Sequence, residues 1–209
     1  MKYTTFPMMA AGILALVIQG AARAGFTDNF NNGTIDSPWQ VVQNGGTIQE
    51  TGGVVHITGV TNQTTWAGNG IHTGFVFPNG DFTATVQFKT PTFSGTGGAP
   101  LTYLQVNSES GNMIGIFYDY PYGLGYRLQS WDVPTQQFGP WLNKFGDETT
   151  AFHTMTLQYT AATATVTGNI DGSSLGSLNI SGQPLVGKLD YYLEGVTDRS
   201  GMNMDISYD

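Results

Sequence analysis

Short runs of β-branched and aromatic residues, separated by Gly, Asn, Asp and Pro, fill the sequence from Phe26 onward and constrain its fold most strongly. Runs of this kind, with turn residues between them, are typical of antiparallel strands. No stretch keeps the periodicity of an amphipathic helix for long. The sequence therefore predicts an all-β fold, an antiparallel two-sheet β-sandwich, because all-β domains of roughly 200 residues commonly form one unit.

The expected strands follow from the same pattern. They are 47–50, 54–58, 75–77, 82–90, 101–108, 113–119, 125–132, 153–159, 164–170, 174–180, 190–195 and 202–208. The segment 44–46 (Asn-Gly-Gly) supplies residues that tolerate a positive φ, so we expect a turn there. We expect a second turn at 68–70 (Gly-Asn-Gly), because glycine pairs of this kind usually mark hairpins.

The N-terminal segment has the features of an export signal. Lys2 precedes an apolar stretch at 8–18, and Ala22-Arg23-Ala24 places small residues at the two positions that a signal peptidase reads. An apolar stretch this short falls below the about 20 residues that span a bilayer. We therefore expect residues 1–24 to be a signal peptide and residues 25–209 to form one domain. The mature protein would be secreted, either extracellular or periplasmic, with no membrane insertion after cleavage.

Charge and cysteine content exclude several functions. The chain has 7 Lys+Arg against 15 Asp+Glu, for a formal net charge of −8, so binding to nucleic acid is not expected. It contains no cysteine, which excludes disulfides, cysteine-ligated metal centres and a thiol nucleophile.

Several segments resemble the concanavalin A-like lectin/glucanase superfamily and its laminin-G-like members. They are 26–30 (FTDNF), 35–39 (IDSPW), 53–57 (GVVHI), 152–159 (FHTMTLQY), 164–172 (ATVTGNIDG), 175–177 (LGS) and 204–208 (MDISY). The resemblance implies a concanavalin A-like jelly roll with a glycan groove on its concave sheet. It covers nearly all of 26–208 with short, degenerate motifs.

Alternation along the strands separates core from solvent. In 82–89 the apolar residues Phe82, Ala84, Val86 and Phe88 are expected to face the core. The same parity leaves planar and polar side chains facing outward in four strands. They are Gln87, Lys89, Tyr103, Gln105, Asn107, Phe117, Asp119, Arg127, Gln129 and Trp131. If these strands are adjacent, the side chains form one face that suits a sugar, because aromatic rings stack on pyranose rings and amides pair with hydroxyls.

The segment 117–145 is rich in aromatic residues, and Trp141 is expected to add a wall beside the same face. Our first hypothesis is therefore an exported carbohydrate-binding protein that recognises a polysaccharide or oligosaccharide. A polysaccharide lyase or glycoside hydrolase using the same face is an alternative. A structural or adhesive surface protein is another.

The sequence lacks the Glu-x-Asp-x-x-Glu arrangement that the resemblance implies for a glucanase. Asp190 and Glu194 could share a strand face, but four residues of strand span about 13 Å. Retaining glycosidases need carboxyls about 5 Å apart. We expect this pair to be exposed sheet charges. A lyase could use Arg127 with His72 or Tyr122, although only the residue types match.

No cofactor is required by any of these hypotheses. The resemblance implies an optional structural calcium ion where the first and last strands meet, and Asp28 and Asp205 occupy the matching positions. His56 and His153 are expected to be structural polar groups, because three well-separated histidines give no zinc spacing.

Overall fold

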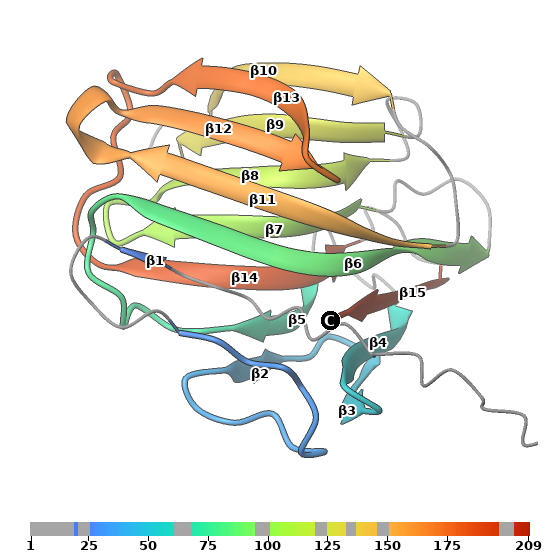
Figure 1. The fold of residues 1–209 in the computed structure, drawn as a ribbon. Helices are drawn as coiled ribbons and strands as arrows, with labels where there is room; N and C mark the ends of the chain where they lie inside the picture. The colour runs from blue at the N-terminus through green and yellow to red at the C-terminus, as the bar shows by residue number, and fades with distance from the viewer. Residues whose placement is uncertain are drawn as a thin grey trace, which may run out of the picture.

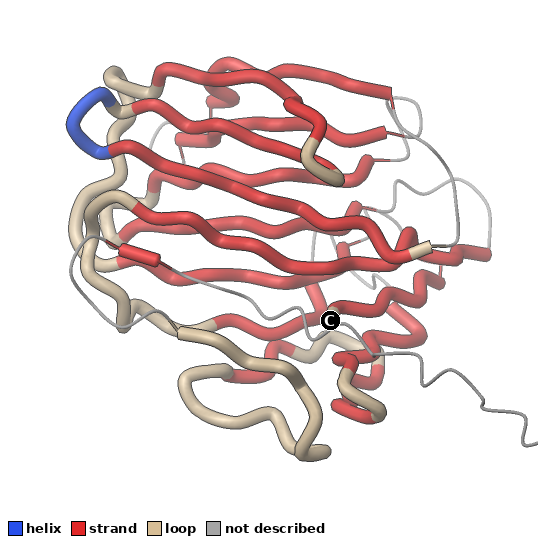
Figure 2. The backbone as a smooth tube through the Cα atoms, in the orientation of Figure 1, coloured by secondary structure: helices blue, strands red, loops and turns tan. Residues whose placement is uncertain are grey.

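A computed structural model describes residues 19–20, 26–60, 68–94, 101–119, 125–132, 137–145, 151–196 and 203–209. Nearly all regular structure in these ranges is strand, as Figure 2 shows, and the single short helix is the 3₁₀ turn Ala161–Thr163. Among the described residues, no helix has the length and apolarity needed to cross a bilayer. The signal peptide expected at 1–24 lies outside them, apart from the two-residue strand β1 (Gln19–Gly20).

Two antiparallel sheets stack face to face (Figure 1), which confirms the predicted sandwich. One sheet has the order β13 (Ser173–Asn179), β12 (Thr165–Ile170), β11 (Phe152–Thr160), β6 (Phe82–Ser94), β15 (Asn203–Tyr208), β4 (Val54–Val60) and β3 (Thr47–Thr51), with β1 on β6. The other has the order β10 (Gln137–Phe145), β9 (Gly125–Asp132), β8 (Asn112–Asp119), β7 (Leu101–Ser108), β14 (Leu189–Val196), β5 (Gly68–His72) and β2 (Gln40–Val42).

The core fills the space between the sheets, as the alternation predicts. Every apolar residue assigned to the interior from 82–89 is buried, from Phe82 at 4% exposure to Phe88 at 0%. On the facing sheet, Leu104, Ile116 and Leu128 are fully buried. Because successive side chains of a strand point to opposite faces, this burial also fixes which side chains lie on the outer face of each sheet.

Some strand predictions are wrong at the edge of the second sheet. Residues 75–77 form a turn that ends in an isolated bridge between Phe77 and Leu189. The segment 68–70, expected to be a turn, is the start of β5 and pairs with β14. The edge strands β2 and β10 were also not expected. Glycine-rich and short edge segments lack the β-branched runs on which the prediction depended.

One buried hydroxyl ties the two sheets together. Tyr208 on β15 crosses the interior and donates a hydrogen bond to the carbonyl oxygen of Glu194 on β14 at 2.8 Å. Its hydroxyl also contacts the Thr102 side chain on β7. Both β7 and β14 carry outer-face residues, so this contact anchors the backbone beneath them.

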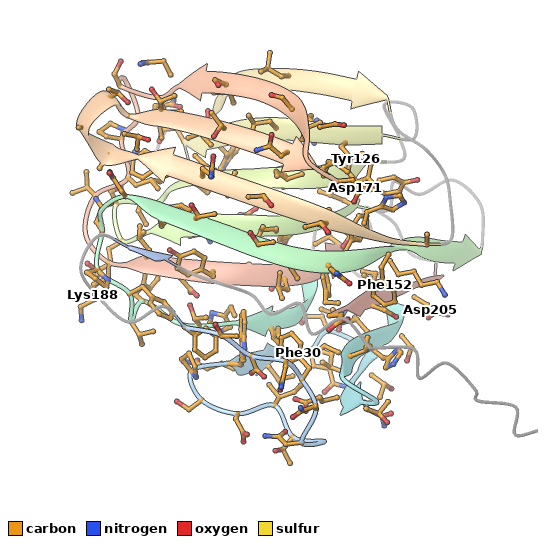
Figure 3. All side chains as sticks on the ribbon, viewed as in Figure 1. Phe30, Tyr126, Phe152, Asp171, Lys188 and Asp205 are labelled. Carbon is orange, nitrogen blue, oxygen red and sulfur yellow. The ribbon has the colours of Figure 1, made fainter. Side chains whose placement is uncertain are left out.

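His153 and Asp171 join the start of β11 to the β12–β13 turn. The His153 ring nitrogen Nδ1 lies 2.7 Å from Asp171 Oδ2, and the Thr154 N–H donates to Asp171 Oδ1 at 2.7 Å. The ring also packs against Tyr126 of the other sheet, and Figure 3 shows Tyr126 and Asp171 at the same end of the molecule. His153 is therefore a structural polar group, as expected from the sequence.

We predict that Asp171→Asn destabilises the protein at neutral pH. Partial burial raises the pKa of Asp171, but the hydrogen bonds from His153 and Thr154 outweigh this effect and leave the pKa below its usual value. The carboxylate therefore stabilises the fold above its unfolded pKa, and this contribution disappears as pH falls through the folded pKa. Thermal unfolding of both proteins from neutral to acidic pH should show a difference that shrinks with acidification. A constant difference would contradict this assignment.

We also predict that Leu104→Ala lowers the free energy of unfolding by about 2–5 kcal/mol, because it leaves a cavity in the interior. Leu104 is fully buried in β7. The control is Gln87→Ala on the outer face of the other sheet, which should change stability by no more than roughly 0.5 kcal/mol. Urea unfolding measures both. Equal losses of unfolding free energy in the two variants would contradict the assignment of Leu104 to the core.

Candidate functional site

The outer face of the seven-stranded sheet, on the side away from the core, carries the candidate site. Strand pairing arranges its side chains in rows that cross β14, β7, β8 and β9. The first row is Asp190, Asn107, Met113 and Trp131; the second is His72, Tyr192, Gln105, Gly115 and Gln129; the third is Glu194, Tyr103, Phe117 and Arg127. These three rows make up the outer face.

Most of the predicted site residues share this face. The strands β7, β8 and β9 are neighbours, and they bring together Tyr103, Gln105, Asn107, Phe117, Arg127, Gln129 and Trp131. Asp119 and Trp141 lie on β8 and β10, but their side chains fall outside the described part of the structure. The placement of Gln87 and Lys89 on this face is wrong, because β6 belongs to the opposite sheet.

Exposure differs among the side chains of the outer face. In the third row, Tyr103, Phe117 and Arg127 are only 7–8% exposed, and Gln129 in the second row is 3% exposed. Asn107, Met113 and Trp131 of the first row are half-buried, as is Tyr192. The expectation that Arg127 and Tyr103 face open solvent is therefore wrong. The partly exposed side chains of the outer face are Asn107, Met113, Trp131, Tyr192 and His72.

Side chains in close contact occupy the middle of the third row. The rings of Tyr103 and Phe117 lie with their centroids 5.3 Å apart, and the Arg127 guanidinium lies 5.6 Å from the centroid of the Phe117 ring. Phe117 also leans over Gly115, where an added Cβ would lie 2.9 Å from the ring. The third row therefore forms a packed floor rather than an open platform.

Asp190 and Glu194 are buried rather than exposed, which corrects the sequence expectation. They are 1% and 6% exposed and lie two rows apart on the same side of β14. The side chain of Glu194 lies over β5, where an added Cβ on Gly68 would be 2.7 Å from Glu194 Oε2 and one on Gly70 would be 2.5 Å from Glu194 Cγ. The two glycines therefore make room for this carboxyl group.

The surroundings of Glu194 favour its neutral form. Burial raises the pKa of Glu194, and the charge of Asp190 acts in the same direction, while the Tyr103 hydrogen bond and His72 partly oppose them. The Tyr103 hydroxyl donates to Glu194 Oε2. Burial, followed by the charge of Glu194, raises the pKa of Tyr103 well above its usual value. A carboxyl group whose pKa is raised is better suited to act as a general acid than one with an ordinary pKa.

Next to Glu194, His72 and Asp190 form a hydrogen-bonded pair. His72 Nδ1 lies 2.9 Å from Asp190 Oδ2, and the Thr73 hydroxyl lies 3.2 Å from Asp190 Oδ1. The imidazole stacks on Tyr192 with a centroid separation of 4.9 Å, and 20% of its side chain is exposed. A carboxylate at this position favours the tautomer with the proton on Nδ1, and in a neutral imidazole of this tautomer Nε2 carries a lone pair. From the sequence, His72 was expected only as a possible partner of Arg127 in a lyase, because β5 was not expected.

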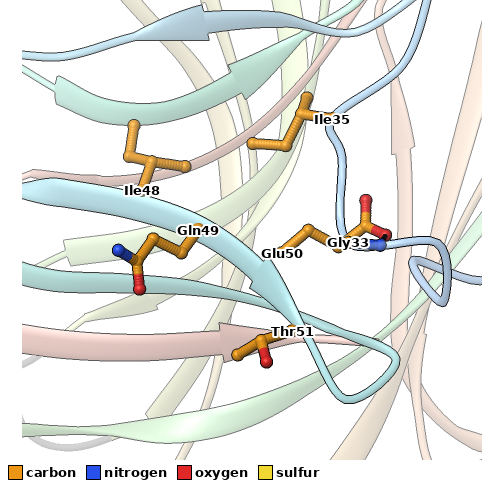
Figure 4. Close-up of a pocket in the computed structure, with 6 residues that line it drawn as sticks. All are labelled: Gly33, Ile35, Ile48, Gln49, Glu50 and Thr51. Atoms are coloured by element: carbon orange, nitrogen blue, oxygen red, sulfur yellow. Dashed lines mark hydrogen bonds between the residues drawn. The ribbon is translucent and has the colours of Figure 1, made fainter.

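A separate pocket of about 490 Å³ lies at the edge of the other sheet (Figure 4). One wall is Glu50, whose Oε1 accepts hydrogen bonds from the Asn32 and Gly33 N–H groups at 3.0 and 2.8 Å. These bonds hold the segment that precedes β2 against β3. The role of Glu50 is therefore structural, and the pocket lacks the aromatic rings of the outer face.

The calcium prediction remains a prediction. Asp28 Oδ1 accepts the Phe30 N–H at 3.0 Å, and Asp205 is an exposed residue of β15 (Figure 3). Within the described ranges, no three His, Asp or Glu side chains gather as a metal centre. The donors seen around these two residues do not by themselves make a calcium site, because calcium takes six to eight oxygen ligands.

No protein-family model and no curated protein matches the sequence. The structure is similar to that of a GlcNAcα1-4Gal-releasing endo-β-galactosidase from Clostridium perfringens, with a TM-score of 0.64 and 11% identity over 99% of this chain. This chain spans 65% of that enzyme's length.

Two glucanases are similar over nearly their whole length. A β-1,3-1,4-glucanase (lichenase) from a mouse hindgut metagenome has a TM-score of 0.66 and 13% identity over 88% of this chain and 95% of its own. The laminarinase catalytic domain of Thermotoga maritima has a TM-score of 0.62 and 12% identity over 92% of this chain and 97% of its own. The protein therefore has the concanavalin A-like jelly-roll fold, which it shares with these glycan-cleaving enzymes.

Proposed function

We propose that the protein acts on carbohydrate, binding a glycan on the outer face of the seven-stranded sheet and hydrolysing a glycosidic bond there. The observation that carries the proposal is Glu194, a carboxyl group that is 6% exposed and whose pKa is raised, beside the His72–Asp190 pair. Glycoside hydrolases need one protonated acid and one basic group on either side of the scissile bond. The similarity to enzymes that cleave galactosides and glucans supports the same class of substrate.

The proposed reaction is a direct displacement by water. Glu194 gives its proton to the leaving glycosidic oxygen as the bond to the anomeric carbon breaks. His72 Nε2 takes a proton from the attacking water, whose oxygen bonds to that carbon, and Asp190 stabilises the imidazolium that forms. The Cα atoms of Asp190 and Glu194 are about 13 Å apart along the strand, which disfavours direct attack by Asp190 and leaves room for a water molecule.

Glycan binding without cleavage is the second candidate. It is favoured by the absence of the Glu-x-Asp-x-x-Glu string and by the low exposure of Glu194. Trp131, Tyr192 and Asn107 would suffice for this function, because rings and an amide can hold a sugar without any proton transfer. It is also the function that the sequence alone favours.

We predict that Glu194→Gln lowers kcat by about 10²–10⁴-fold on any polysaccharide that the protein cleaves, because the amide cannot donate the acid proton. A panel of β-glucans and galactans, assayed for new reducing ends, measures the activity. Binding by affinity electrophoresis should change little, since the amide keeps the shape of the carboxyl group. Gln87→Ala on the opposite sheet is the control and should retain activity.

Each outcome of this assay decides between the candidates. Binding with no cleavage by the unaltered protein would leave glycan recognition as its function. Cleavage that Glu194→Gln does not reduce would remove Glu194 from the reaction. If the protein neither binds nor cleaves any polysaccharide of the panel, both candidate functions are refuted.

We also predict that Glu194→Gln stabilises the protein at neutral and higher pH. Folding raises the pKa of Glu194, so the proton stabilises the folded state fully below the unfolded pKa, and this contribution is lost as pH rises through the folded pKa. The glutamine side chain of the variant does not titrate, so it makes no pH-dependent contribution to stability. Melting temperatures of the two proteins should therefore diverge as pH increases. Glu109→Gln, at an exposed turn position, controls for loss of charge. A parallel response of all three proteins would show that folding does not raise the pKa of Glu194.

A further inference from the structure

Three side chains hold the buried carboxyl group of Asp190, which is only 1% exposed. His72 Nδ1 lies 2.9 Å from its Oδ2 atom, and the Thr73 hydroxyl lies 3.2 Å from its Oδ1 atom. Tyr192, two residues further along the same side of β14, adds a third hydrogen bond from its hydroxyl. Because a buried carboxylate without such partners is costly, these three bonds fix the direction in which its oxygens point.

The Thr73 hydroxyl is a weak partner of Asp190. Its one proton is shared, because the Gly74 carbonyl oxygen and Asp190 Oδ1 both lie 3.2 Å from Thr73 Oγ1. Hydroxyl donors usually lie within about 3.0 Å of their acceptors. The Thr73 oxygen also accepts the Tyr191 N–H at 3.0 Å, which ties it to the backbone. The orientation of Asp190 therefore depends on the Tyr192 hydroxyl as well.

A chain of hydrogen bonds directs the Tyr192 hydroxyl toward Asp190. Gln105 Nε2 donates to Asn107 Oδ1 at 2.7 Å, and Asn107 in turn hydrogen-bonds to the Tyr192 hydroxyl. The Asn107 bond favours the ionised phenol, so the amide is the donor there, whereas the Asp190 bond favours the neutral phenol, so the hydroxyl is the donor. The donors all point toward Asp190, and hydrogen bonds in such a chain strengthen one another.

Tyr192 also contacts the other member of the pair. Its ring stacks on the His72 imidazole, with centroids 4.9 Å apart and an angle of 25° between the planes. Burial, followed by the charge and the hydrogen bond of Asp190, raises the pKa of Tyr192, so its hydroxyl keeps the proton that it donates. One side chain therefore touches both the imidazole and the carboxylate that faces Nδ1.

We propose that Tyr192 is a positioning residue of the candidate site. Its hydroxyl orients the Asp190 carboxylate toward His72 Nδ1, and its ring holds the plane of the imidazole, so that Nε2 lies on the side of the ring away from the acid. This inference rests on the proposed function, in which Nε2 takes a proton from the attacking water.

NMR tests the arrangement without any substrate. The Nδ1 proton of His72, identified by its loss in His72→Gln, should exchange slowly with water in the unaltered protein. In Tyr192→Phe, which keeps the ring and loses only the hydroxyl, the exchange rate should rise at least about tenfold, the factor that a hydrogen bond to a charged group is worth. Tyr159→Phe removes a buried hydroxyl from β11 of the opposite sheet and should leave the rate unchanged.

Asn107→Ala is the second variant. It keeps His72, Asp190 and Tyr192 and removes the amide that holds the Tyr192 hydroxyl, so the exchange rate should rise in this protein too. Exchange in Tyr192→Phe as slow as in the unaltered protein, or rapid exchange in the unaltered protein itself, would overturn the inference. If Tyr192→Phe does not fold, Asn107→Ala decides by the same criterion.

Cleavage assays separate positioning from glycan contact. On a polysaccharide that the protein cleaves, Tyr192→Phe should lower kcat about tenfold or more and leave the half-saturating concentration within about twofold, because the ring is kept. A higher half-saturating concentration with unchanged kcat would make the hydroxyl a glycan contact and overturn the inference. If no polysaccharide is cleaved, the proposed function fails, and the NMR comparison still decides whether Tyr192 orients the pair.

Discussion

The burial of alternate side chains between two sheets is the constraint on which the rest of the structure depends. Leu104, Ile116 and Leu128 are fully buried in neighbouring strands. Since neighbouring side chains of a strand point in opposite directions, fixing these three inward forces Tyr103, Phe117 and Arg127 onto the other face. The site is therefore a consequence of the core, and a shift of one residue in any of these strands would turn its side chains inward.

Much of this could be predicted from the sequence. The pattern of 101–132 identified three strands and the side of each that faces away from the core, because regular alternation is a local property; that these strands are neighbours was assumed. It placed Gln87 and Lys89 on the same face only by assuming that β6 is a neighbour, and β6 lies in the other sheet. Which strands pair is decided by long-range contacts that no local pattern encodes.

The carboxyl groups were harder to predict. The sequence indicated that Asp190 and Glu194 could share a strand face. Their burial, however, depends on β5, and a turn was expected there because this strand begins Gly-Asn-Gly. Gly68 and Gly70 are suited to this strand because side chains there would collide with Glu194. The side chain that requires glycine at these two positions is on another strand, 126 residues after Gly68 and 124 residues after Gly70.

The position of β15 affects how the protein is made. This strand lies between β6 and β4 in its sheet, yet it follows every other strand in the sequence. Until it leaves the ribosome, the edges of β6 and β4 remain unpaired and Tyr208 cannot reach the backbone of β14. Nascent chains that lack it expose strand edges prone to aggregation, so this sheet can close only after β15 has been made.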